Sequence, residues 1–96
     1  MKSKTYNKMS DLTTDLGLSP ERGDIAEMKA RLTVEIAKAV KKQKLTHLEV
    51  SELSEVPRSA ITGIINGSLQ KVSIERLVRV LGSLGKRVEL RIKRVA

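Results

Sequence analysis

Residues 45–67, with the sequence LTHLEVSELSEVPRSAITGIING, constrain the fold of this chain more than any other stretch. Thr46 is a good helix N-cap, and Glu49 stands three residues later, where a capping box requires its acid. Pro57 is expected at the first position of a second helix, where its missing N–H costs no hydrogen bond. Asn66 and Gly67 tolerate the left-handed conformation that ends a helix. Two short helices joined by a tight turn are therefore predicted.

Apolar residues give each of these short helices a side that can be buried. Val50 and Leu53 are expected to point inward from the first helix. Ile61, Ile64 and Ile65 form the apolar face of the second helix. This arrangement predicts a helix-turn-helix, whose second helix enters the major groove of duplex DNA.

Helical periodicity extends to both sides of this motif. Residues 10–16 are compatible with a short helix, residues 19–44 predict a long amphipathic helix, and residues 73–84 predict the last one. We expect a mainly all-α fold of about five helices, with residues 1–18 as a flexible arm and residues 19–96 as one DNA-binding domain. The expected buried face of the long helix consists of Ile25, Met28, Leu32, Ile36 and Val40.

The hydrophobic period changes near the C-terminal end. Apolar and charged residues alternate from Val88 to Lys93, which predicts a β-strand over residues 87–95. Because a lone strand leaves its edges unpaired, we expect it to pair with the same strand of a second copy around a two-fold axis. The residues expected at this homodimer interface are Leu81, Val88, Leu90 and Ile92.

The net charge of +8 favours a polyanionic partner, but the charge is unevenly distributed. Residues 45–72 contain two basic and three acidic residues, so the predicted DNA-reading unit is slightly acidic. Residues 24–44 contain six basic and three acidic residues, and residues 73–96 contain seven and two. The flanks of the motif therefore carry the positive charge.

The composition argues against several other classes of protein. The chain has no cysteine and one histidine, so neither a disulfide, a metal site nor a cysteine nucleophile is expected. The acidic residues are scattered and no glycine-rich phosphate loop is present, so we expect neither an enzyme nor a cofactor. Tyr6 is the only aromatic residue, which disfavours single-stranded nucleic-acid binding. No apolar run approaches a membrane span, and a cytoplasmic location is expected.

The motif resembles that of the XRE (Cro/cI-type) helix-turn-helix family, which implies a lambda-repressor-like bundle. Leu45, Thr46, Ile61 and Gly67 match the family pattern. His47 replaces the usual Gln, Ser51 replaces the usual Ala, and Glu55-Val56-Pro57 replaces a Gly-Val-Ser turn. Glu55 thus stands where the family usually has Gly.

The resemblance extends over residues 15–93. The stretches DLGLSPERGDIAEMKARLTVEIAKAV and VSIERLVRVLGSLGKRVELRI are similar to those of HigA-like antitoxins, which are paired with HigB/RelE-like toxins. This resemblance implies a homodimer that binds the double-stranded operator DNA of its own operon and neutralises a cognate toxin protein. The toxin is expected to contact residues 10–36, because the reading helix leaves them free.

Arg58 is the strongest candidate for reading a base, since its guanidinium can donate two hydrogen bonds to guanine. Ser59 and Thr62 could contact bases or phosphate, and Gly63 would permit close approach. His47 occupies the position at which the family's Gln touches phosphate, although a capping or surface role is equally open. The full set of candidate DNA-binding residues is His47, Pro57, Arg58, Ser59, Thr62, Gly63, Asn66 and Lys71.

Three functions are compatible with these observations. The first is a DNA-binding antitoxin that represses its own operon. The second is a stand-alone, phage repressor-like transcriptional repressor without a toxin partner. The third is an adaptor whose helix-turn-helix binds protein, which the acidic residues 45–72 favour.

Overall fold

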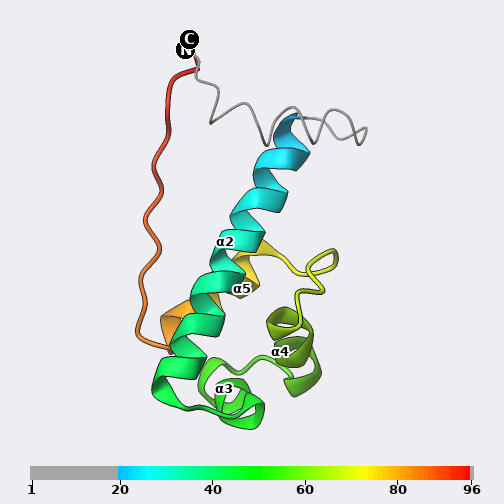
Figure 1. Ribbon diagram of the computed structural model, residues 1–96, viewed down its shortest axis with the longest axis vertical. Coiled ribbons are helices and arrows are strands. Elements are labelled where there is room, and N and C mark those ends of the chain that lie inside the picture. The colour runs from blue at the N-terminus through cyan, green and yellow to red at the C-terminus, as the bar shows by residue number, and fades with distance from the viewer. Residues whose placement is uncertain (1–19, 96) are drawn as a thin grey trace. The chain divides into compact units, whose positions relative to one another are not determined.

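The computed structural model describes residues 20–95 and contains four helices and no strand within them (Figure 1). These are α2 (Pro20–Gln43), α3 (His47–Ser54), α4 (Arg58–Ile65) and α5 (Ile74–Ser83). The prediction of a mainly helical fold is confirmed, and each of these helices lies where the sequence predicted one. The helix expected at residues 10–16 and the arm expected at residues 1–18 lie outside the described residues.

The core lies within residues 28–89 and draws on all four helices. The first short helix, α3, packs against both α4 and α5. The loop residue Val56 is also buried, so the turn between α3 and α4 is anchored to the core. The other buried apolar residues are Ile36, Ala39, Val40, Val50, Ile61, Ile64, Leu77, Val80, Leu81 and Leu84.

Only part of the predicted apolar face of α2 is buried. Ile36 and Val40 belong to the core and Leu32 packs partly against it. Ile25 and Met28 are 43% and 40% exposed, so the prediction that they are buried is wrong. Periodicity identifies an apolar face along a whole helix, but burial requires neighbouring side chains. The core residues of α2 begin only at Ile36.

The helix α3 begins with the predicted capping box. The Thr46 hydroxyl accepts from the backbone N–H of Glu49 at 3.1 Å, and the Thr46 N–H donates to the Glu49 carboxylate at 2.8 Å. Val50 is buried as predicted, but Leu53 is exposed and Ser54 is buried in its place. Residues four apart lie on one side of a helix, so Ser54 follows Val50 on the inner side.

The predicted C-terminal strand does not form. Residues 86–95 are neither helix nor strand and continue from α5 as an extended segment, coloured orange to red in Figure 1. A strand requires a second strand to complete its hydrogen bonds, and the described part of this chain supplies none. The predicted interface residue Leu81 is 2% exposed and lies in the core, whereas Val88, Leu90 and Ile92 are exposed.

Candidate nucleic-acid interface

The turn between α3 and α4 is held by side-chain hydrogen bonds that fix how α4 leaves α3. The Ser51 hydroxyl donates to the Val56 carbonyl at 2.6 Å. The buried Ser54 hydroxyl donates to the Val50 carbonyl at 2.7 Å and accepts from the Val56 N–H at 3.3 Å. The sequence analysis noted Ser51 only as a replacement for the usual Ala and did not identify this role of Ser54. Serine at helix ends often bonds to nearby backbone, which was the available signal.

Glu55 ends α3 in the left-handed conformation, with φ 59° and ψ 31°. Its backbone N–H donates to the Ser51 carbonyl at 2.8 Å, which closes the last turn of the helix. A residue with a Cβ atom adopts this conformation at a cost of about 1–2 kcal/mol, which glycine avoids. The departure from the usual glycine at this position is therefore a strained feature of this chain.

Pro57 immediately precedes α4 and is its N-cap residue, with φ −54° and ψ 142°. Its carbonyl accepts from the backbone N–H groups of Ala60 and Ile61 at 2.9 Å and 3.0 Å. The prediction that Pro57 occupies the first helical position is wrong by one residue, although the proline does mark the helix start. Its extended ψ angle turns the chain from α3 into α4.

The two sides of α4 have different roles. Ile61 and Ile64 are fully buried and attach the helix to the core. Among the residues on its remaining surface, Arg58, Ser59 and Asn66 are exposed, whereas Thr62 and Gly63 are half-buried. A Cβ atom added at Gly63 would meet nothing within 4 Å. Packing within the protein therefore does not require a glycine there.

His47 and Thr62, both predicted to contact DNA, lie beside each other. The His47 Nδ1 atom is 3.0 Å from the Thr62 hydroxyl oxygen, so a hydrogen bond connects the start of α3 to the middle of α4. The Nε2 atom of His47 is not part of this bond. The hydrogen bond places the two side chains at one site and holds them in a fixed relation.

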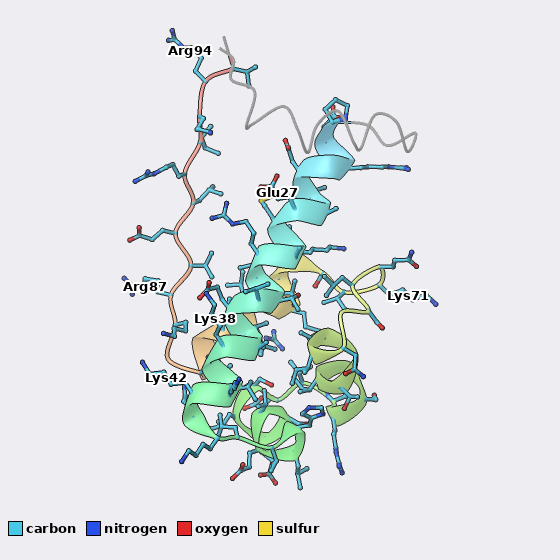
Figure 2. All side chains as sticks on the ribbon, in the orientation of Figure 1. Glu27, Lys38, Lys42, Lys71, Arg87 and Arg94 are labelled. Carbon is cyan, nitrogen blue, oxygen red and sulfur yellow. The ribbon has the colours of Figure 1, made fainter. Side chains whose placement is uncertain are left out.

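The end of α4 and the loop after it place the last two candidates. The N–H of Gly67, whose φ is 85°, donates to the Ile64 carbonyl at 3.0 Å and stops the helix just after Asn66. Lys71 is exposed on the following loop, as Figure 2 shows. The Lys29 ammonium on α2 is 3.4 Å from the Leu69 carbonyl and ties this loop to the long helix.

The charges around α4 follow the uneven distribution seen in the sequence. The three acidic residues of α3 and its cap, Glu49, Glu52 and Glu55, are exposed. Four exposed lysines, including the labelled Lys38 and Lys42 of Figure 2, surround the C-terminal end of α2. Lys38 lies 3.6 Å from the Glu35 carboxylate, but both side chains are largely exposed, so water screens this pair. The α2 lysines are therefore available to a polyanion.

A family model described as a helix-turn-helix domain matches residues 12–93 of this chain, which therefore belongs to that helix-turn-helix family. The match includes α3, the turn and α4, in agreement with the motif predicted from residues 45–67. Neither the search of curated proteins nor the search of solved structures finds a match to the chain.

None of the helices in residues 20–95 has the combination of length and apolarity that a membrane crossing requires. Within the same residues, no three histidine, cysteine or acidic side chains gather in a way that could hold a metal ion.

Proposed function

We propose that this protein binds duplex operator DNA through α4 and acts as the antitoxin of a toxin–antitoxin pair, repressing its own operon as a homodimer. The observation that carries the DNA-binding part is the two-sided character of α4. Ile61 and Ile64 fix the helix to the core, and the residues on its other surface include Arg58. Membership in a helix-turn-helix family supports placing that surface in the major groove.

Arg58 would supply most of the sequence discrimination in this complex. It is the only charged residue of α4, and its guanidinium can donate to two acceptors of a guanine. Ser59, Thr62 and Asn66 would add weaker contacts to bases or phosphates. The half-buried Gly63 would let the backbone of α4 approach the groove closely, since a methyl group there would project into unoccupied space.

Phosphate affinity would come from outside the motif. The α3 helix is acidic, so the exposed Lys41, Lys42 and Lys44 and the loop residue Lys71 would provide the salt-dependent attraction. A half-site read by one guanidinium binds weakly. Two such half-sites, held by a homodimer, would give the affinity that a repressor needs.

The toxin would contact α2 rather than α4. Met28 and Val34 are exposed large apolar residues on α2, and they are left uncovered by the core. This supports the expectation that residues 10–36 receive the toxin, although residues 10–19 lie outside the described range. We further propose that the chain has no catalytic activity of its own.

A gel-shift titration tests the DNA-binding proposal. The full chain is titrated against the DNA upstream of its gene and against random duplex of the same length. We expect the upstream DNA to bind about 1,000-fold more tightly or better, since about 1,000-fold is the lower end of the range by which specific sites exceed non-specific ones. Equal affinities for the two duplexes would refute specific reading.

The antitoxin part requires a separate experiment. The chain is co-expressed with the product of the adjacent gene, and the complex is purified and sized. Recovery of a stable complex, together with relief of growth inhibition by the neighbouring product, supports the antitoxin. Specific DNA binding without any complex would instead identify the stand-alone repressor.

One observation favours a second candidate function, an adaptor that binds a basic protein. The α3 helix exposes Leu48 and Leu53 together with Glu52, a mixed apolar and acidic surface that is unsuited to DNA. If the chain binds upstream and random DNA alike, substitution of both leucines by serine decides whether this surface binds protein.

A further inference from the structure

His47 and Thr62 share a hydrogen bond whose direction depends on the protonation state of the imidazole. The His47 Nδ1 atom lies 3.0 Å from the Thr62 hydroxyl oxygen, and both residues are half-buried. A neutral imidazole has one nitrogen that donates and one that accepts, whereas a protonated imidazole donates from both. A threonine hydroxyl has a single hydrogen but two acceptor lone pairs. The protonation state of His47 therefore decides whether that hydrogen is used within the protein.

In the neutral pair, contact with DNA decides which ring nitrogen carries the hydrogen. Among residues 20–95, the His47 Nε2 atom takes part in no hydrogen bond, so it is open to the DNA backbone. Phosphate oxygens accept hydrogen bonds and cannot donate them, so a neutral His47 beside a phosphate carries its hydrogen on Nε2. The Nδ1 atom then accepts from the Thr62 hydroxyl. Toward the bases, Thr62 is left with acceptor lone pairs alone.

A second ring proton reverses this hydrogen bond. The Nδ1 atom of His47 then donates to the Thr62 hydroxyl oxygen, while Nε2 continues to donate to the phosphate. The hydroxyl hydrogen of Thr62 is released and can be donated to DNA. In the major groove, an accepting hydroxyl fits the amino groups of adenine and cytosine, whereas a donating hydroxyl fits N7 of a purine, O6 of guanine or O4 of thymine. The two protonation states of His47 thus favour different base atoms at the same place.

We propose that His47 and Thr62 form a proton-dependent specificity element, in which protonation of His47 converts Thr62 from an acceptor into a donor toward the bases. This inference rests on the DNA binding of the proposed function and specifies how one contact of α4 is regulated. Thr62 lies one turn after Arg58, so both residues are on the same side of α4. For the base contact His47 is a positioning residue, because it acts through the Thr62 hydroxyl.

The charged groups around this pair leave the DNA backbone as the source of negative charge for a protonated His47. On α3, the Glu49 carboxylate accepts from the Thr46 N–H at 2.8 Å within the capping box. Arg58 on α4 and Lys44 before α3 are cationic and exposed. The helix α5, which packs against α3, has its charged residues exposed to solvent: Glu75, Arg76 and Arg79.

The test uses pH, because His47 is the only histidine of the chain. Among unperturbed side chains, histidine alone changes charge between about pH 5 and 8. The full chain selects bound duplexes from a randomised pool at about pH 8 and at about pH 5.5, and the bound duplexes are sequenced. At one position of the selected site, we expect base enrichment to change about two- to tenfold, as the exchange of one hydrogen bond allows. Identical preferences at both pH values would overturn the proposal.

Matched variants assign a pH dependence to this pair. His47→Gln has no ring to protonate and Thr62→Val has no hydroxyl, so each should select the same bases at both pH values. Thr62→Ser keeps the hydroxyl and should retain the pH dependence. Circular dichroism at both pH values shows that each variant is folded. A pH-dependent preference that persists in Thr62→Val, or that is lost in Thr62→Ser, would contradict the proposal.

Failure of this inference is distinguishable from failure of the proposed function. Enrichment of a defined sequence with the same preferences at both pH values refutes only the role of His47 and Thr62, and leaves specific DNA binding standing. If no sequence is enriched at either pH value, the DNA binding on which the inference rests is refuted, and the inference with it.

Discussion

The α3–α4 pair and residues 86–95 are both predicted by clear patterns in the sequence, yet only the first folds as predicted. In the α3–α4 pair, the chain itself supplies every partner: a capping box, two serine hydroxyls in the turn, and buried isoleucines. In residues 86–95 the alternation is equally regular, but no second strand is present in the described chain. A hydrophobic pattern thus predicts which face of a segment is apolar, but the segment forms a helix pair or a sheet only where another segment packs against that face or bonds to its backbone.

The largest expected effect on stability comes from truncating a leucine to alanine in the core that holds the α3–α4 pair, compared with the same truncation in residues 86–95. Leu77→Ala removes fully buried atoms and should destabilise the fold by about 2–5 kcal/mol. Leu90→Ala removes the same atoms from a side chain that is 80% exposed, and should change the stability of the monomer by less than about 0.5 kcal/mol. Urea denaturation at a concentration that keeps the chain monomeric measures both. Similar losses for the two variants would show that residues 86–95 pack within one chain.

Arg58→Ala tests whether the helix pair, once folded, reads DNA. The side chain is exposed, so stability should be unchanged while operator affinity falls by about 1–3 kcal/mol. Arg79→Ala on α5 removes the same charge from another exposed position and serves as the control. The ratio of operator to random-duplex affinity should fall for Arg58→Ala alone. An equal ratio in both variants would mean that Arg58 attracts DNA only through its charge and does not read a base.

Glu55→Gly removes the strained cap between the two helices. We expect stabilisation of about 1 kcal/mol, because glycine avoids the cost of the left-handed conformation but gains freedom in the unfolded chain. Glu52→Gly, three residues earlier in α3, is the matched control and should destabilise by about 1 kcal/mol. Thermal melts should therefore move in opposite directions. A loss of stability in Glu55→Gly would mean that the glutamate side chain contributes more than its conformation costs.

Gly63→Ala is expected to raise stability while weakening DNA binding, so it separates folding from function. A Cβ atom meets nothing within 4 Å at either Gly63 or Gly82, so both Gly63→Ala and Gly82→Ala should stabilise their helices by just under 1 kcal/mol. Only Gly63→Ala should weaken operator binding, because only Gly63 lies on α4. Undiminished binding by Gly63→Ala in a gel shift would place the DNA farther from this part of the helix.

The limits of the sequence prediction are clearest at Leu53, Ser54 and Met28. Periodicity favoured Leu53 as a buried residue, but the eight-residue helix α3 turns Val50 and Ser54 inward instead. Ser54 is tolerated in the core because its hydroxyl both donates and accepts there. Met28 continues the apolar face of α2 beyond the core residues. The apolar periodicity of one helix does not predict where the neighbouring helices end, and so it does not predict which part of its apolar face is buried.

The candidate site, like the core, was predicted only in part from the sequence. The sequence identified the reading helix and its exposed residues, since helix starts and stops depend on local chemistry. It did not predict that His47 and Thr62, fifteen positions apart, share a hydrogen bond. That contact depends on how α3 and α4 cross, which the turn at Glu55 and the hydroxyls of Ser51 and Ser54 determine together.

The sequence by itself determined where the four described helices lie, with α4 starting one residue later than predicted, and the left-handed stop at Gly67. Caps, turns and periodicity act within a few residues, so they can be recognised without knowing the rest of the fold. Only the tertiary structure decided which apolar faces are buried, which backbone groups the Ser51 and Ser54 hydroxyls bond to, and that residues 86–95 form no strand. Burial and strand pairing depend on groups that are distant in sequence, and they stabilise the fold only when those groups come into contact.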